Sequence, residues 1–324
     1  MQTVVNKESS VDAEVPIKRQ RNLMDYVGLV LRGFAMGSAD VVPGVSGGTM
    51  AFILGIYEEL INSIRMVGQP AFWQTVLAFR IKEAIEMINL RFLVAVFSGI
   101  LLAVLSLAQG LEWMLHNQPV LLWSFFFGLV LASVVVVGKS IKQWNIQLML
   151  ATTIAAVDAF ILVGLVPLET PNSWWFLILS GACAICAMIL PGISGAFILV
   201  LLGKYQFILG AVNDLDIVTI ALVGIGAIVG LVTFAQVLGW LFQRYHDLTV
   251  ALLIGLMIGS LRKIWPWKEV IEFIERKGEI IPTIEHNVLP PAFDEQFAFA
   301  LLLGVAGFAF VFALDRWANK PQHA

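Results

Sequence analysis

Charged residues are scarce in this sequence. Of its 324 residues only 13% are charged, whereas 59% are hydrophobic, and its mean hydropathy is +0.87. Soluble domains carry about 25% charged and about 45–50% apolar residues. The composition therefore excludes an ordinary soluble core of this size. Apolar stretches long enough to cross a bilayer recur along the chain instead.

Groups that carry catalysis or bind metals are also scarce. The four histidines are dispersed, and the sequence contains no GxSxG, Walker A or HExxH motif. Cys183 and Cys186 lie in an apolar run, where small packing residues are favoured over a redox pair. The net charge of −3 disfavours a nucleic-acid partner. The sequence thus predicts no enzyme, no metal site and no cofactor.

Two kinds of apolar segment are present. Full-length or adequate spans are expected at 92–115, 120–138, 147–168, 217–242, 248–265 and 297–314. Shorter segments at 24–39, 49–64, 174–190 and 193–212 meet in pairs at Pro43-Gly44 and at Pro191-Gly192. Proline removes a backbone donor, and glycine permits backbone angles that a helix forbids. Two short helices joined by such a break predict a re-entrant hairpin.

An internal repeat relates the two halves of the chain. PGVSGGTMAFILGIY begins at Pro43 and PGISGAFILVLLGKY at Pro191, so Pro, Gly, Ser and Tyr residues coincide at an offset of 148. Gly33 falls on Gly181 at the same offset. At an offset of 127, Gly99, Gln109, Trp113 and Gly128 fall on Gly226, Gln236, Trp240 and Gly255. Apolar composition alone does not produce two ordered sets that include Pro, Tyr, Gln and Trp.

The repeat predicts a topology. A hairpin makes no net crossing, so three spanning helices in each half would invert the second half relative to the first. We expect an all-α integral membrane protein: an inverted repeat with two re-entrant helical hairpins and about six transmembrane helices. The expected units are a cytoplasmic tail at 1–22, a first repeat at 23–170 (hairpin 24–64) and a second repeat at 171–318 (hairpin 174–212, external loop 262–296).

The distribution of Lys and Arg gives the expected orientation. The segments 116–119, 168–173 and 213–216 contain neither residue, whereas 65–91 contains four, 139–146 two and 243–247 one, and both chain ends contain others. The positive-inside rule places the second set, with both termini, in the cytoplasm. The loop 262–296 is the exception, because it is expected outside although it contains five basic residues beside seven acidic ones. The spacing of its charges is helical.

The two Pro-Gly turns form the candidate binding site. A break inside a membrane survives only where protein or a water-filled cavity covers it, so two symmetric breaks predict a shared cavity. The helix starts after Gly48 and Gly195 would direct N–H groups into it, which favours an anion such as phosphate. Hydroxyl donors come from Ser46, Thr49 and Ser194. The alternative is a pair of tight helix–helix turns whose serines bond to the backbone.

Four charged residues in or beside the apolar segments are candidates for a functional role. Arg32 and Glu58 are each about ten residues from the first break, roughly 15 Å along a helix, and are expected to face each other near the cytoplasmic mouth. Asp40 lies beside the break and Asp158 in the middle of 147–168. Arg32 is a candidate for attracting phosphate, and the three carboxylates are candidates for carrying a coupling proton. A backbone cap, a solvated charge and a structural pair are their respective alternatives.

The run GFAMGSADVVPGVSGGTMAFILGIYEELI at 33–61 resembles a bacterial membrane family regarded as polyprenyl-phosphate transporters of the PopT type. ILPGISGAFILVLLGKY at 189–205 is similar to the second hallmark of that family, and the resemblance extends over about 23–317. It implies a multi-pass flippase in the bacterial inner membrane. Such a protein returns undecaprenyl phosphate from the outer to the cytoplasmic leaflet, for reuse in peptidoglycan and other envelope polymers.

The resemblance also implies a set of substrate-binding residues. By position they are Asp40, Pro43, Gly44, Ser46, Gly47, Gly48, Tyr57, Glu58, Pro191, Gly192, Ser194, Gly195 and Tyr205, and the charge and hydroxyl pattern adds Arg32 and Thr49. The family often has an acidic residue after the second tyrosine, but here it is Gln206. The alternative function is a transporter or channel for a small soluble anion. The coupling ion, the lipid chain length and a homo-oligomeric state stay open.

Overall fold

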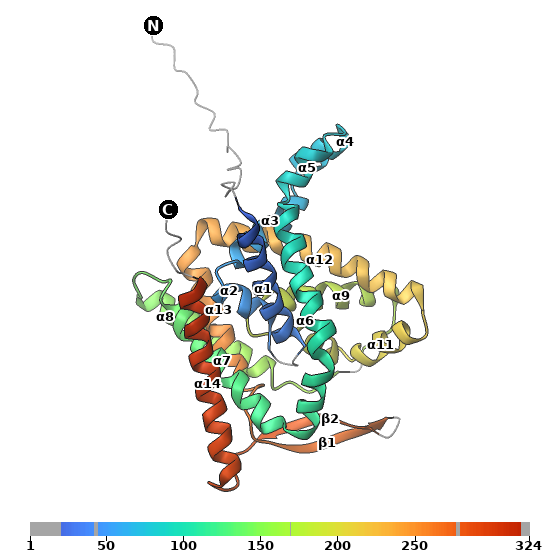
Figure 1. The fold of residues 1–324 in the computed structure, drawn as a ribbon. Helices are drawn as coiled ribbons and strands as arrows, with labels where there is room; N and C mark the ends of the chain where they lie inside the picture. Colours follow the sequence, from blue (N-terminus) through green and yellow to red (C-terminus); the bar gives the residue numbers. More distant parts are fainter. Residues whose placement is uncertain (1–20, 42–44, 169, 277–278, 319–324) are drawn as a thin grey trace.

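The computed structural model describes residues 21–41, 45–168, 170–276 and 279–318, and it is mostly helical (Figure 1). The first half contains α1 (Leu23–Asp40), α2 (Gly47–Ile53), α3 (Tyr57–Val67), α4 (Pro70–Leu77), α5 (Ile81–Met87), α6 (Leu90–Asn117), α7 (Pro119–Gly138) and α8 (Ile146–Leu162). The second contains α9 (Trp174–Ile189), α10 (Gly195–Leu201), α11 (Tyr205–Asn213), α12 (Ile217–Arg244), α13 (His246–Ser260), β1 (Lys268–Arg276), β2 (Glu279–Asn287) and α14 (Glu295–Ala318). Pro43, Gly44 and residues 1–20 of the predicted tail lie outside the described residues.

The spanning helices are fewer than the sequence predicts. Within the described residues, α6, α7, α12 and α14 are long and apolar enough to cross a membrane. The pair α10 and α11, bent by 108° at their join, would make a fifth span if counted as one. The expected span 147–168 ends at Leu162 because Gly164 and Pro167 follow it, and both residues disfavour a continued helix. The molecule is thus a multi-pass membrane protein with four or five candidate spans.

The expectation of an all-α fold is wrong for the loop 262–296. There β1 and β2 form a two-stranded antiparallel sheet, in which Lys268 pairs with Asn287 and Arg276 with Glu279. The β-branched residues of KEVIEFIER and EIIPTIEHN favour strands. Both strands of a two-stranded sheet are edge strands, where a proline such as Pro282 is accepted. These preferences prevail over the helical spacing of the glutamates.

Each predicted hairpin contains an additional bend. The segments expected as single arms at 49–64 and 193–212 are divided into α2 and α3, and into α10 and α11. The bends lie at Gly55 and Gly203, which have φ of +66° and +63° and are equivalent at the offset of 148. An L-residue with a side chain rarely adopts these angles.

The two halves pack their helices through glycines that are equivalent in the internal repeat. In the pair α1 and α6, a Cβ on Gly99 would lie 2.0 Å from the carbonyl oxygen of Val30. In the pair α9 and α12, a Cβ on Gly226 would lie 1.9 Å from that of Ile178. Gly226 is Gly99 shifted by 127, and Ile178 is Val30 shifted by 148. Equivalent helices therefore pack through equivalent residues.

The remaining long helices pack across the two halves. Helix α7 packs against α14, where a Cβ on Gly128 would lie 1.8 Å from the carbonyl oxygen of Gly304. Helix α13 packs against α8, where a Cβ on Gly255 would lie 2.3 Å from that of Thr152. The last helix of each half thus lies against the penultimate helix of the other.

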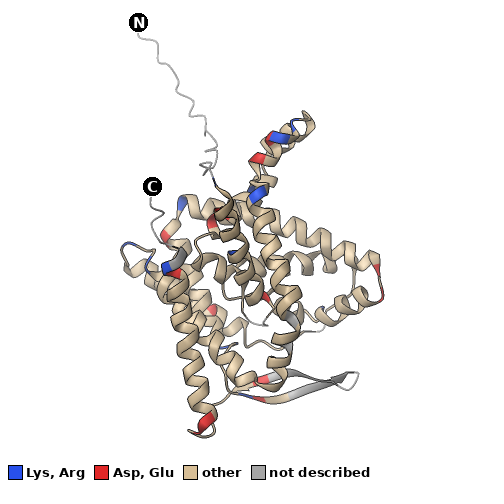
Figure 2. Cartoon of the chain, in the orientation of Figure 1, with Lys and Arg blue, Asp and Glu red and all other residues tan. Residues whose placement is uncertain are grey.

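The molecule has two distinct ends (Figure 1). The start of α1, the end of α14 and the projecting α4–α5 arm lie at one end, and the β1–β2 hairpin and the start of α14 lie at the other. Figure 2 shows that charged residues gather mainly on the arm and at helix ends, which leaves most of α6, α12 and α14 without charge. This arrangement is compatible with a bilayer around the apolar middle.

Candidate functional site

The first turn is closed by its own side chains. The backbone N–H of Gly47 donates to Asp40 Oδ1 at 2.6 Å, and that of Gly48 donates to Ser46 Oγ at 3.1 Å. Asp40 is half-buried, and a Cβ on Gly47 would lie 2.3 Å from its Oδ2. Asp40 therefore takes the backbone-capping role that the sequence left as an alternative. Its carboxylate occupies the position at the start of α2 where an external anion would bind.

The two predicted turns meet at the centre of the molecule. The hydroxyl of Ser46 donates to the carbonyl oxygen of Leu190 at 3.0 Å, and the hydroxyl of Tyr57 donates to that of Ile189 at 3.2 Å. The backbone N–H of Gly192 donates to Thr49 Oγ1 at 3.0 Å. These bonds satisfy backbone groups that α9 leaves without helical partners. Side chains of the first motif thus supply hydrogen-bond partners for the backbone at the break in the second motif.

Backbone proximity explains the glycines at this crossing. A Cβ on Gly48 would lie 2.5 Å from the carbonyl oxygen of Ile189. Gly192 has φ of +88°, and a Cβ there would lie 2.9 Å from Ser260 Oγ. Thr49 is fully buried. The first turn is therefore packed in this conformation, with its hydroxyls committed to protein partners.

The second turn is more open than the first. Ser194 is half-buried, and within the described residues its side chain makes no capping hydrogen bond. Tyr205 is 37% exposed, whereas its counterpart Tyr57 is 2% exposed. Pro191 and Gly195 are buried, and a Cβ on Gly195 would lie 2.6 Å from the carbonyl oxygen of Ala184. The two equivalent motifs thus differ in burial and in hydrogen bonding.

The charged residues near the first motif have partners that the sequence did not indicate. Glu58 Oε1 lies 3.2 Å from His246 Nε2, at the join of α12 and α13, and its side chain is half-exposed. Neighbouring Glu59 accepts hydrogen bonds from Nη1 and Nη2 of Arg21, at 2.7 and 2.6 Å. Arg32 lies half-buried on α1. His246 and Glu59 were missed because their partners lie 188 and 38 residues away in the chain.

Asp158 lies outside this assembly. It is exposed on α8, four residues before the helix ends at Leu162, rather than at the middle of a span. Its neighbours Val157 and Phe160 are also exposed. The structure therefore does not bring Asp158 to the two turns.

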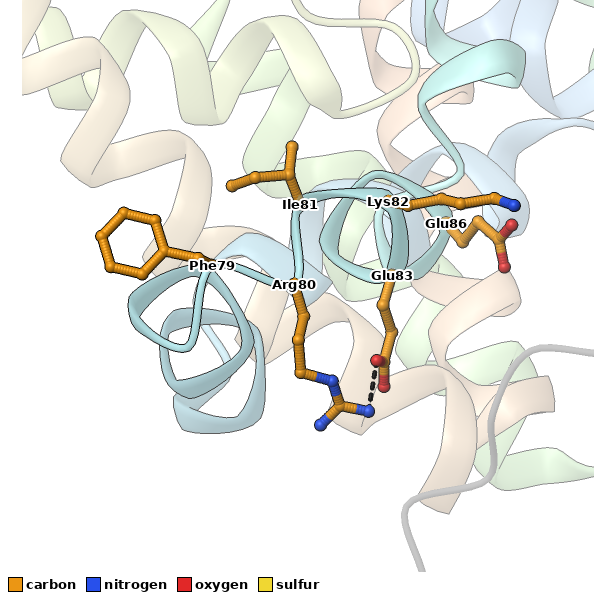
Figure 3. Close-up of a pocket in the computed structure, with 6 residues that line it drawn as sticks. All are labelled: Phe79, Arg80, Ile81, Lys82, Glu83 and Glu86. Atoms are coloured by element: carbon orange, nitrogen blue, oxygen red, sulfur yellow. Dashed lines mark ion pairs between the residues drawn. The ribbon is translucent and has the colours of Figure 1, made fainter.

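A concave surface occurs elsewhere, on the arm (Figure 3). It has a volume of about 630 Å³ and is lined by Phe79, Arg80, Ile81, Lys82, Glu83 and Glu86, of which Arg80 and Glu83 form an ion pair. Its walls come from α5 and the turn before it, far from the central turns in Figure 1. It is a surface groove and not a substrate chamber.

Among the residues that the structure describes, no group of three His, Cys, Asp or Glu side chains could hold a metal ion.

Known proteins match almost the whole chain. Residues 36–281 match a family described as undecaprenyl phosphate translocase-like. A polyprenyl-phosphate transporter of Vibrio cholerae is 42% identical over 306 residues, which cover 92% of this chain and 98% of that protein. A polyprenyl-phosphate transporter of Staphylococcus aureus is 31% identical over 258 residues, which cover 73% and 85%. No solved structure matches.

These matches confirm the resemblance seen in the two motifs, and they confirm that the family consists of transporters and not of enzymes. The matched region includes both turns and the helices that surround them. The chain belongs to the polyprenyl-phosphate transporter family of membrane proteins.

Proposed function

We propose that this protein carries undecaprenyl phosphate from the outer to the cytoplasmic leaflet of the bacterial inner membrane, so that the carrier lipid is reused. The observation that carries the proposal is the 42% identity that spans 98% of the Vibrio cholerae polyprenyl-phosphate transporter. The hydrogen bonds that join both motifs support a shared substrate path. The lipid tail stays in the bilayer while the headgroup crosses.

The phosphate headgroup binds at the two turns. Ser194 is the hydroxyl that is free of a capping bond among the described residues, so the headgroup meets the second turn first. Ser46, Thr49 and Tyr57 join when they exchange their bonds to α9 for bonds to phosphate. A charged acceptor strengthens such bonds, which favours the exchange. Arg32 and the glycines of both motifs complete the proposed site, together with Pro43 and Gly44.

The coupling proton enters at Asp40 in this proposal. Its carboxylate holds the N–H of Gly47 and would repel a phosphate placed at the same turn. Protonation removes the negative charge and weakens that bond. Binding of the phosphate and of the proton therefore favour each other. Glu58, which faces His246, and Asp158 are the second and third candidates for this role.

The repeats are inverted in the membrane, with units at 23–170 and 171–318 and both termini in the cytoplasm. The equivalent glycine contacts of α1–α6 and α9–α12 support two equivalent units. The position of the start of α1 and the end of α14 at one end of Figure 1 supports termini on one side. An inverted pair lets the two halves alternate between open and closed.

Lipid movement in proteoliposomes tests the function. Labelled undecaprenyl phosphate is placed in one leaflet, and its appearance in the other is followed for wild type, Ser46→Ala plus Ser194→Ala, and Arg32→Ala. We expect wild type to move the lipid and both variants to lose most of the rate while they stay folded. Movement no faster than in empty liposomes under every imposed gradient would overturn the proposal. A flux of inorganic anions would then support the soluble-anion alternative.

A further inference from the structure

Two lysines share one carboxylate at the base of the β hairpin. Lys263 Nζ and Lys268 Nζ lie 3.4 and 3.2 Å from the same oxygen, Glu285 Oε2. The side chain of Lys268 is 9% exposed, while those of Lys263 and Glu285 are 29% and 25% exposed. Among the side chains that the structure describes, two ammonium groups face one carboxylate, which leaves an excess positive charge in a partly dehydrated position. A bridge with only a structural role needs one lysine, and each further buried cation costs desolvation energy.

Aromatic rings hold the two ammonium groups in place. Lys268 Nζ lies 4.5 Å from the ring centroid of Trp123 on α7, and Lys263 Nζ lies 5.3 Å from that of Phe197 on α10. A cation–π contact orients an ammonium without neutralising its charge. Trp265 and Trp267 lie between the two lysines in the sequence, and tryptophan prefers the depth of lipid headgroups. The cluster therefore suits an anion at the membrane interface.

The lysine pair adjoins the second turn. Phe197 follows Gly195 by two residues. Ser260 precedes Lys263 by three residues, and its Oγ would lie 2.9 Å from a Cβ on Gly192. Lys263 thus contacts α10 two residues after Gly195 and lies three residues along the chain from a contact with Gly192, which places the pair beside the second turn. It also lies at the β-hairpin end of the molecule, which the proposed topology places at the outer face of the membrane (Figure 1).

We propose that Lys263 and Lys268 form a capture site for a phosphate monoester, where the lipid headgroup binds before it reaches the second turn. Glu285 is the resident anion that the incoming phosphate displaces from the lysines. This inference rests on the proposed function and adds to it the residues that first receive the substrate. The same chemistry would recognise free phosphate, so the test separates the two sources.

The test uses the full chain in proteoliposomes and measures the initial rate against the amount of undecaprenyl phosphate supplied. For Lys263→Gln plus Lys268→Gln we expect the half-saturating amount to rise at least about tenfold with little change in maximal rate. Lys268→Arg keeps the charge and restores most of the affinity. The matched control is Lys139→Gln, since Lys139 Nζ also lies over an aromatic ring, 4.7 Å from Phe312, but on the loop after α7.

Glu285→Gln distinguishes capture from a structural role. If the carboxylate competes with phosphate, its removal lowers the half-saturating amount a few-fold. If the trio only holds the hairpin, the variant loses stability and gains no affinity, which would overturn the proposal. An unchanged half-saturating amount in the double lysine variant would overturn it as well.

Two further outcomes assign a failure to its cause. A lysine-dependent flux of inorganic phosphate would give the site to free phosphate and overturn the lipid assignment. If wild type moves no undecaprenyl phosphate at all, the proposed function fails, and the capture site fails with it. If wild type moves the lipid and the double variant matches it, the capture site alone is wrong.

Discussion

At the scale of single residues, hydroxyl groups of the first motif form hydrogen bonds that join the two halves. Ser46 and Tyr57 donate to carbonyl oxygens at the end of α9, and Thr49 accepts from Gly192. Their counterpart Ser194 makes no capping bond within the described residues. Equivalent positions therefore contribute differently to stability, although both belong to the proposed headgroup site.

Ser46→Ala and Ser194→Ala form a matched pair for that difference. Ser46→Ala leaves the partly buried carbonyl of Leu190 and the buried N–H of Gly48 without their partner, so we expect a loss of about 1–3 kcal/mol in unfolding free energy. Ser194→Ala should cost much less. Thermal unfolding of the purified proteins in detergent measures both. Equal losses would contradict this structural role of Ser46.

Lys268 makes substrate affinity depend on pH. Burial lowers its pKa to about 8, the ammonium of Lys263 acts in the same direction, and Glu285 opposes both. The charge is present at pH 7 and is lost above about pH 8. We expect the half-saturating amount of lipid to rise between pH 7.5 and about 9, because the neutral amine binds phosphate weakly. Lys268→Arg should abolish this rise, and a wild-type curve that parallels the arginine variant would refute the idea.

At the scale of the helices, close packing through glycine decides which substitutions are tolerated. A Cβ on Gly226 would lie 1.9 Å from the carbonyl oxygen of Ile178, whereas a Cβ on Gly224 meets no atom within 4 Å. Both residues lie on α12, two positions apart. Gly226→Ala must therefore push α9 and α12 apart, which we expect to cost about 1–3 kcal/mol.

Gly224→Ala is the control on the same helix. Alanine is the better helix former by up to about 1 kcal/mol, so this variant should be neutral or slightly stabilised. Thermal unfolding in detergent compares the two proteins. A destabilised Gly224→Ala would show that helix propensity and backbone effects, rather than the contact with Ile178, decide the outcome.

The elements follow from the sequence where hydropathy alone defines them. Helices α6 and α12 extend at most two residues beyond the predicted 92–115 and 217–242. The bends at Gly55 and Gly203 were missed because both glycines lie inside segments whose overall apolar composition predicts a single helix. The hairpin of β1 and β2 was missed because its glutamates are spaced as on a helix, although its β-branched residues favour strands. In this segment the strand propensity of the β-branched residues outweighs the helix-like spacing of the charges.

At the scale of the whole molecule, the sequence predicted that the two turns meet, because the repeat makes them equivalent. It did not predict which atoms bond, since Ser46 and Leu190 are 144 residues apart. The pair of Lys263 and Glu285 was missed for a related reason, because strand register brings Glu285 back to the base of the hairpin. Such pairings depend on tertiary geometry that no local spacing encodes.

Cysteine accessibility tests the topology of the whole chain. In a background with Cys183 and Cys186 replaced by serine, Gln74→Cys on the arm should react from the cytoplasmic side only. Asp214→Cys after α11 and Val270→Cys on β1 should react from the outer side. The positive-inside distribution and the two ends seen in Figure 1 give this expectation. Labelling of Gln74→Cys and Asp214→Cys from the same side would rule out the inverted arrangement.

The packing of α7 on α14 also has a consequence for biosynthesis. Helix α7 ends at Gly138, and its partner begins at Glu295, 157 residues later. At ribosomal rates of about 5–20 residues per second, α14 leaves the ribosome roughly 8–30 s after α7. During that interval the face of α7 around Gly128 lies against lipid or the insertion machinery. Completion of the first half must therefore wait until nearly the whole chain has been translated.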